Sequence, residues 1–168
     1  MSKIQLNKSS PQNFEIIFPK IPTESRVSSS EELTLNIFQT VIPSVSLESE
    51  ERSWQGGVGQ IDAGRLTFEP FFVNFTVDSE LKNWLTIWKW MTFIHNNENR
   101  YGGGYKTWIV DATLKITDNN RKQILVITFE SVWPNMLGEV TLSHREGETQ
   151  LQSNCNFMYN RYTIRELD

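Results

Sequence analysis

The stretch that decides the fold is Thr107-Trp-Ile-Val-Asp-Ala-Thr-Leu-Lys-Ile-Thr117, in which apolar and polar side chains alternate. Alternation with a period of two is typical of a β-strand with one buried and one exposed face. The turn sequence Asp118-Asn-Asn-Arg121 follows, and a second run of strand-forming residues occupies 122–133. Two such runs joined by a short polar turn predict an antiparallel β-hairpin.

The composition favours a β-rich protein built as one unit. The chain has 168 residues, within the ~100–200 that one domain commonly takes, so we expect a single domain over 1–168. It contains 10 Phe, 6 Trp and 4 Tyr but only two alanines, and 51 residues are Ser, Thr, Asn or Gln. Alanine is the strongest helix former, whereas aromatic residues and threonine are enriched in strands. This balance excludes coiled coils and helical bundles.

Further strands are predicted along the rest of the chain. Phe14–Phe18 is a short strand closed by prolines, and a long strand over 66–77 is expected to carry a bulge at Pro70. Four more strands are expected at 33–37, 45–51, 138–142 and 149–164. The remaining segments are expected to form a polar N-terminal arm over 1–12 and loops over 25–32, 52–64, 96–106 and 144–148. The elements together predict a mainly β protein, an antiparallel sandwich or barrel of about seven to eight strands with one inserted α-helix.

That helix is predicted over 79–94, with Asp78 or Ser79 as its N-terminal cap. At ~100° per residue, one face carries Leu81, Trp84, Leu85, Trp88 and Met91. Trp90 and Phe93 point away from that face. The apolar surface is therefore wider than the stripe that a surface helix needs. We expect the helix to pack on its own sheet and also against something else.

Charge and hydropathy exclude several classes of protein. The net charge is −4 and the sequence pI is about 5.3, so the chain lacks the cationic patch that tight binding to a phosphate backbone requires. Cys155 is the single cysteine, so no internal disulfide can form. The chain begins without an apolar run of signal-peptide length, and its longest apolar runs, such as 71–77 and 124–129, are too short to cross a bilayer. We expect a soluble protein with no membrane partner.

No catalytic or cofactor site stands out in the sequence. His95, His144 and Cys155 do not have the spacing of metal ligands. The glycine-rich segments 56–59 and 102–104 are not followed by the Lys-Ser/Thr that opens the helix of a P-loop. A small-ligand β-barrel would need a pocket with converging polar groups, which no segment nominates. We therefore expect a non-enzymatic protein without a cofactor or a metal.

Four aromatic residues are candidates for subunit contacts. Trp54 lies in the glycine-rich segment, Trp90 and Phe93 lie off the expected core face of the helix, and Trp133 precedes a proline. Exposed aromatic side chains that do not reach a core mark interfaces. The alternative is partial burial of the same side chains under loops.

The last expected strand has an unusual polar face. Its apolar face includes Leu151, Cys155 and Phe157. The opposite face carries uncharged amides at Gln150, Gln152, Asn154 and Asn156. A free surface would be expected to carry Lys and Glu at such positions.

The order of motifs resembles the tail tube proteins of contractile-tailed phages. Trp-Pro-Asn-Met-Leu-Gly-Glu-Val at 133–140 is similar to their Trp-Pro-x-x-x-Gly-Glu-Leu/Val strand, which precedes a polar turn and a long final strand ending in aromatic residues. Upstream, 52–56 resembles an Arg-x-Trp/Phe-x-Gly loop and 66–69 a Leu-Thr-Phe-Glu strand, before a capped, tryptophan-rich helix. The resemblance extends over residues 13–164 in the order of elements.

The resemblance implies hexameric rings that stack into the inner tube of the tail, each subunit adding strands to a continuous β-barrel. The tail sheath protein would lie outside this tube and the tape-measure protein inside it, with baseplate and tail terminator proteins at its ends. The chain would belong to the virion, after assembly in the host cytoplasm, and the genome would pass through without specific binding. Type VI secretion tubes and baseplate tube initiators share this architecture and stay open as alternatives.

The residues themselves agree with a channel role. An acidic protein with amide-rich strand faces suits a channel that passes DNA, because clustered cations would hold its phosphates. The face with Gln150, Gln152, Asn154 and Asn156 is therefore the candidate lining of the lumen. Strand alternation leaves open which polar face points inward.

Overall fold

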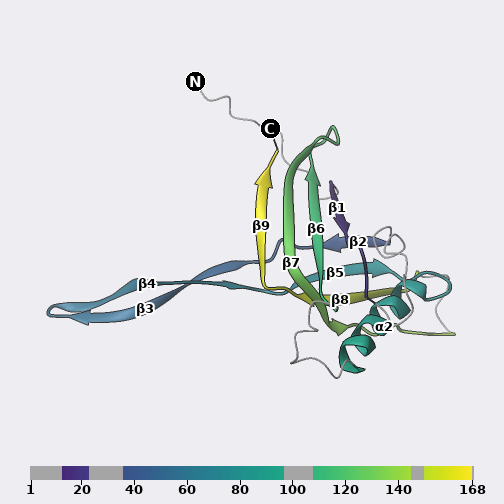
Figure 1. Ribbon diagram of the computed structural model, residues 1–168, viewed down its shortest axis with the longest axis horizontal. Coiled ribbons are helices and arrows are strands. Elements are labelled where there is room, and N and C mark those ends of the chain that lie inside the picture. Colours follow the sequence, from purple (N-terminus) through teal and green to yellow (C-terminus); the bar gives the residue numbers. More distant parts are fainter. Residues whose placement is uncertain (1–12, 23–35, 97–107, 145–149, 168) are drawn as a thin grey trace.

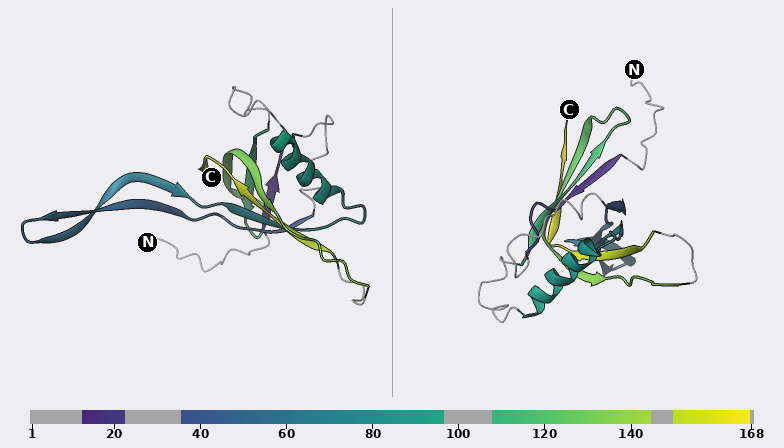
Figure 2. Two further views of the ribbon diagram at one scale, coloured as in Figure 1. Left: turned by 90° about the horizontal axis from the view of Figure 1, so that it is seen from below. Right: turned by 90° about the vertical axis from the view of Figure 1, so that its right-hand side faces the viewer.

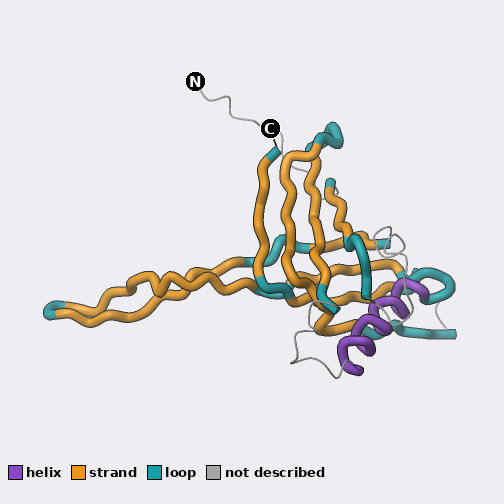
Figure 3. Tube along the Cα trace, viewed as in Figure 1, coloured by secondary structure: helices purple, strands orange, loops and turns teal. Residues whose placement is uncertain are grey.

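The computed structural model describes residues 13–22, 36–96, 108–144 and 150–167, and these residues form nine strands and one helix (Figures 1 and 3). The strands are β1 (Phe14–Ile17), β2 (Ile37–Thr40), β3 (Val45–Trp54), β4 (Gly57–Phe68), β5 (Phe71–Thr76), β6 (Val110–Thr117), β7 (Gln123–Leu137), β8 (Gln152–Met158) and β9 (Arg161–Glu166). The helix is α2 (Lys82–Asn96). A mainly β fold with antiparallel pairing and one inserted helix is confirmed.

The body consists of two antiparallel sheets that share the longest strand, β7. The first part of β7 pairs with β6 on one side and β9 on the other, and β6 pairs with β1; we call this the β9 sheet. The end of β7 pairs with β8, which pairs with β5, which pairs with β2; we call this the β8 sheet. In Figure 1 the β9 sheet stands upright and the strands of the β8 sheet run across its base. The shared strand makes the body one continuous sheet folded at a corner.

The corner lies at Ser131, inside β7. Ser131 has a φ of 59°, a left-handed conformation that is costly for a residue with a side chain. Its backbone N–H donates to the Asp111 carboxylate at 2.9 Å. One residue earlier, the carbonyl of Glu130 accepts from the N–H of Asn160 at 3.0 Å. These bonds hold the bend where β7 leaves one sheet and enters the other.

A second corner divides the strand expected over 149–164. The chain leaves β8 at Met158 and re-enters a strand at Arg161, so Tyr159 and Asn160 form the bend. β8 pairs with the end of β7, and β9 pairs with its beginning. The two halves of the expected strand therefore follow the two halves of β7 around the corner.

Aromatic rings fill the angle between the sheets. Phe71 stacks on Phe129 at a centroid distance of 4.5 Å and on Phe157 at 5.3 Å. Tyr159 meets Phe129 edge-on and donates its hydroxyl to the carbonyl of Glu69 at 2.7 Å. These rings come from three separate parts of the chain, near residues 71, 129 and 157–159, so the core depends on the pairing of distant strands.

The packed face of the helix is rotated from the one that the sequence indicates, although Leu81, Trp84 and Met91 of the expected face still pack against the core. Its buried residues are Asn83, Thr86, Ile87 and Trp90. Leu85 and Trp88, expected in the core, are 38% and 48% exposed. The expectation that Trp90 lies off the core is wrong, because its side chain has no exposed surface and its indole N–H donates to the carbonyl of Trp108 at 2.7 Å.

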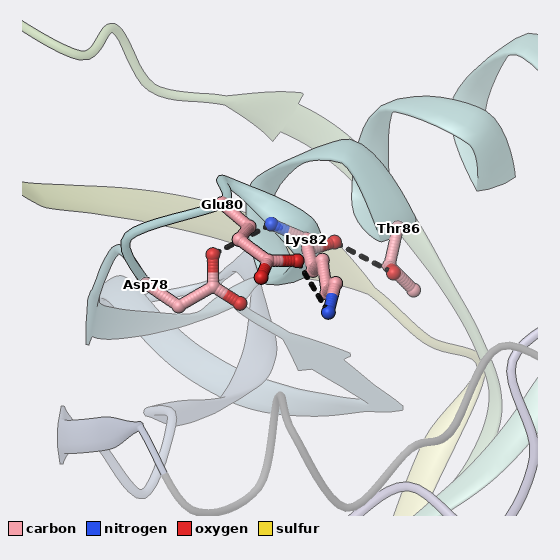
Figure 4. Close-up of polar contacts among 4 residues, drawn as sticks. All are labelled: Asp78, Glu80, Lys82 and Thr86. Carbon is pink, nitrogen blue, oxygen red and sulfur yellow. Dashed lines mark hydrogen bonds and ion pairs between the residues drawn. The ribbon is translucent and has the colours of Figure 1, made fainter.

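Polar bonds at the helix N-terminus select this face. The Asp78 carboxylate accepts from the backbone N–H of Lys82 at 2.6 Å, which confirms Asp78 as the cap (Figure 4). Asn83 donates its amide to the carbonyl of Thr76 at 2.7 Å and accepts from the backbone N–H of Trp84 at 2.9 Å. A polar residue is thus buried because it ties the helix to the end of β5.

Several expected boundaries are corrected by the structure. Segment 52–64 is not a loop but the outer half of a β3–β4 hairpin, and 66–77 is two strands separated at Glu69–Pro70 rather than one bulged strand. Residues 138–142 form no strand. The expected arm over 1–12, loop over 25–32 and most of the expected strand at 33–37 lie outside the described residues.

We predict that Trp90→Ala lowers the free energy of unfolding by about 3–5 kcal/mol, because it empties a large buried site and removes a hydrogen bond. The matched control is Trp88→Ala on the exposed face, with an expected loss below about 1 kcal/mol. Urea denaturation followed by circular dichroism measures both. Equal losses in the two variants would contradict the helix orientation.

Candidate assembly surfaces

The β3–β4 hairpin extends far from the body, as Figures 1 and 2 show. Among the residues that the structure describes, its two strands pair only with each other, and every side chain of β3 is exposed. A two-stranded hairpin is marginally stable in water without further packing. Yet this one exposes large apolar side chains at Val45, Leu47, Trp54, Val58, Ile61 and Leu66. The hairpin therefore has the composition of a segment that is packed by another chain.

The glycines of the hairpin have specific tasks near its tip. Gly56 has a φ of +127°, which a side chain would strain, and it forms the turn between the strands. The ring of Trp54 lies over Gly59, where a Cβ atom would approach its Cη2 to 2.1 Å. Trp54 remains 58% exposed. The ring of Trp54 therefore lies at the surface, and the absence of a side chain at Gly59 leaves the space on which that ring packs.

The other aromatic candidates are divided by the structure. Trp90 is fully buried within the subunit and offers no surface for a neighbour. Phe93 and Trp133 are partly exposed, and the ring of Trp133 meets Trp108 edge-on at 6.1 Å. The four candidates therefore do not form one patch. Sequence reasoning missed the exposed pair Leu85 and Trp88 because it assigned both to the core.

The amide residues of β8 lie together on the outer face of the β8 sheet. Gln152, Asn154 and Asn156 stand opposite Thr76, Asn74 and Phe72 of β5. Asn74 donates its amide to the side-chain carbonyl of Gln39 on β2 at 2.8 Å. Gln150 is exposed and precedes the strand. The uncharged face thus extends across three strands, which the sequence of one strand did not reveal.

This face contains a hollow. A shallow, open depression of about 380 Å³ is lined by Phe38, Gln39, Asn74, Glu139, Thr141, Gln152, Ser153 and Asn154. Glu139 is the single ionisable residue of that lining, and no lysine or arginine contributes to it. A depression without cations can border a polyanion without holding its phosphates.

Gly138 joins the edge of this face to the helix. Its carbonyl accepts from the indole N–H of Trp84 at 3.1 Å and from the hydroxyl of Ser153 at 3.0 Å. Its N–H donates to the carbonyl of Asn154 at 2.7 Å. A Cβ atom at this position would lie 1.8 Å from the side-chain oxygen of Asn154. The glycine of the Trp-Pro-x-x-x-Gly motif is therefore required by a close approach to an amide-face residue.

The described residues show no arrangement for catalysis. Burial raises the pKa of the Cys155 thiol well above its usual range, so the thiolate that a nucleophile requires is suppressed. Burial also raises the pKa of Tyr159, with smaller contributions from Tyr162 and Glu69. Within the described ranges, no group of three His, Cys, Asp or Glu side chains could hold a metal ion. The described part of the chain also has no helix long and apolar enough to span a membrane.

Comparison with known proteins assigns the family. The family model for phage tail tube proteins matches residues 9–165. The chain belongs to the phage tail tube protein family. The tail tube terminator protein of Enterobacteria phage T4 is 31% identical over 144 residues, which cover 83% of this chain and 78% of that protein. This protein is thus a tail-tube-like or terminator-like structural component of a phage tail.

Solved structures show the same fold at low sequence identity. The tube-terminating cap of the anti-feeding prophage superposes with a TM-score of 0.65 at 11% identity, over 99% of this chain and 100% of that chain. A chain of the anti-feeding prophage baseplate gives a TM-score of 0.63 at 11% identity, over 99% and 98% of the two chains. The shared fold confirms the mainly β fold class that the sequence indicates.

We predict that Gly138→Ala lowers the free energy of unfolding by about 2 kcal/mol, because the new methyl group displaces Asn154. Asn154→Ala in the same chain should recover part of this loss, since it removes the clashing side chain. Gly57→Ala is the control, because nothing lies within 4 Å of a Cβ atom there. Urea denaturation of the four proteins tests the contact, and an unchanged Gly138→Ala variant would show that it is absent.

Proposed function

We propose that this protein forms hexameric rings that continue the inner tube of a contractile phage tail, and that it occupies the terminal ring. The observation that carries the terminal position is the 31% identity to the T4 tail tube terminator over most of both chains. A phage relative at this identity also favours a phage tail over a type VI secretion tube. Sixfold symmetry is supported by the anti-feeding prophage baseplate, whose structure was solved with 6-fold symmetry.

The surface that lines the channel in this proposal is the amide face of the β8 sheet. The inner wall of a ring must be concave toward the axis, and this face contains the depression described above. Its Gln152, Asn154 and Asn156 carry no charge, so DNA can slide past without releasing or gaining counterions. Gln150, just ahead of β8, extends the same polar surface. The tape-measure protein would occupy this channel before the genome passes.

The β3–β4 hairpin provides the contact with neighbouring subunits in this proposal. Its exposed apolar side chains and unpaired edges are buried once another subunit packs against them. Trp54 near its tip is the strongest anchor, since aromatic side chains dominate interface energies. Phe93 and Trp133, both partly exposed, are secondary candidates for the same assembly. The sheath protein would contact the outside of the ring, and the adjoining tube or the baseplate would contact its ends.

A second candidate is the repeating subunit of the tube itself. The observation that favours it is the family model, which describes tail tube proteins and matches 9–165. A repeating subunit must present two ring faces that fit each other, so it stacks without limit. A subunit of a terminal ring must bind the tube with only one of its two ring faces. The same holds for a baseplate initiator, which binds the other end of the tube.

Electron microscopy of the purified protein at increasing concentration separates these roles. We expect this protein alone to form rings that do not stack into long tubes. We expect these rings to attach to one end of tubes made from the phage's main tube protein. Long tubes formed by this protein alone would assign it as the repeating subunit. Growth of main tube protein from its rings would assign it as an initiator, and a monomer at every concentration would contradict ring assembly.

We predict that Gln152→Lys combined with Asn154→Lys slows DNA ejection by about tenfold or more, because the ring then presents cations to the phosphates. The control is Gln123→Lys combined with Thr163→Lys, which adds the same charge to exposed positions on the β9 sheet. Particle counts by microscopy report assembly, and ejection in vitro and infectivity report passage. If particles that carry both lysine substitutions assemble and eject DNA at the normal rate, the amide face does not line the lumen.

A further inference from the structure

The depression in the amide face extends across the whole width of the β8 sheet. Its lining begins at Phe38 on β2, continues over β5 and β8, and ends at Glu139 beyond β8. The backbone N–H of Gly138 donates to the carbonyl of Asn154 at 2.7 Å, so the segment that carries Glu139 lies next to β8. Three steps between neighbouring strands, each about 4.8 Å, give the depression a length of roughly 14 Å.

The two ends of this depression differ in chemistry. At one end, the side chain of Phe38 is 46% exposed and offers an aromatic ring to an apolar group. At the other end, Glu139 is exposed and is the single ionisable residue of the lining. A carboxylate in a lining without lysine or arginine attracts a cation. A ligand that fills the depression therefore needs an apolar group at one end and a cation at the other.

Uncharged amides line the stretch between the two ends, at Gln39, Asn74, Gln152 and Asn154. The amide of Asn74 donates to the side-chain carbonyl of Gln39 at 2.8 Å. That bond uses one acceptor and one donor, so an amino group and a carbonyl of this pair can still bind a ligand. A polypeptide backbone supplies donors and acceptors to such amides. A phosphate backbone supplies acceptors only, and its charge is repelled by Glu139.

Building on the proposed channel role, we infer that the depression binds an extended, basic polypeptide inside the channel and thereby distinguishes protein from DNA. Residues four apart in an extended chain lie roughly 13 Å apart and point to the same side. An apolar side chain therefore contacts Phe38 when a Lys or Arg four residues away pairs with Glu139, and the amides between them bind the backbone. A ring repeats the site in every subunit, so weak contacts add up on one polypeptide.

Nuclear magnetic resonance of the 15N-labelled protein tests the site, because the side-chain amides of Gln152 and Asn154 give signals of their own. The probe is the pentapeptide acetyl-Leu-Ser-Gly-Ser-Lys-amide, and its control is the same peptide with Glu in place of Lys. We expect the Lys peptide to shift both signals until they saturate, and the Glu peptide to bind at least about tenfold more weakly. Equal shifts with the two peptides, or no shift with either, would overturn the proposal.

Substitutions at the two ends test the direction of the contacts. Glu139→Gln should weaken binding of the Lys peptide by about tenfold and abolish its advantage over the Glu peptide, whereas Phe38→Ser should weaken both peptides by the same factor. Glu166→Gln is the matched control, because it removes the same charge from an exposed position on the β9 sheet. Circular dichroism checks that each variant folds. A Glu139→Gln variant that binds the Lys peptide like the parent would contradict the cation end of the site.

Two further probes separate a polypeptide from other ligands. Spermidine carries ammonium groups without a peptide backbone, and we expect it to leave the signals of Gln152 and Asn154 unsaturated. A short DNA duplex should leave them unshifted. Saturation by spermidine alone would make the depression a site for free polyamines, and saturation by the duplex would make it a site for DNA. Either result would overturn the inference.

Electron microscopy of the same samples keeps this inference separate from the proposed function. If rings form but the Lys peptide does not bind, the peptide site is wrong while the proposed ring stands. If the Lys peptide binds but no ring forms at any concentration, the depression is a peptide site and the proposed function is wrong.

Discussion

The hydrogen bond from the backbone of Ser131 to the carboxylate of Asp111 supports the feature on which the body depends. A strand of 15 residues would otherwise continue straight, and its two halves could not serve two sheets. The left-handed residue turns the strand, and the carboxylate satisfies the N–H that the turn would leave without a partner. Once β7 is bent, β8 and β9 must bend with it, because they follow its two halves. The angle that encloses the aromatic core is thereby set.

This corner also explains how a small protein presents two different outer faces. The β9 sheet carries paired charges on its surface, such as Glu130 with Arg161 at 2.7 Å. The β8 sheet carries amides and an open depression. A single flat sheet would give its two faces to a core and to solvent, whereas the folded sheet gives the protein two outward faces of contrasting chemistry. In a ring, one of them can face the channel and the other its surroundings.

The sequence predicted the regular strands well because their side chains alternate. The hairpin of β6 and β7 and the amide face of β8 follow from that pattern. The break between β8 and β9 was missed, although the sequence marks it. The apolar positions are odd-numbered up to Tyr159 and even-numbered at Tyr162 and Ile164, with two polar residues between them. The long hairpin was missed for a different reason. Its glycines suggested a loop, although only Gly56 and Gly64 have a positive φ. Gly59 instead lies under the ring of Trp54, where a side chain would clash with that ring.

The helix shows where periodicity misleads. Leu85 and Trp88 of the more apolar face are exposed. Asn83 and Trp90 are buried instead, and each donates a hydrogen bond to a backbone carbonyl. Those partners lie in β5 and at Trp108, so no local pattern could identify them. Two of the candidate contact residues therefore differ in exposure, because Trp54 lies at the surface and Trp90 is buried.

The hairpin has a consequence for the life of a subunit before assembly. Its extended backbone is unprotected on both edges, which is the form of chain that proteases bind most readily. A subunit left without neighbours should be cut there first, whereas one packed into a ring should be spared.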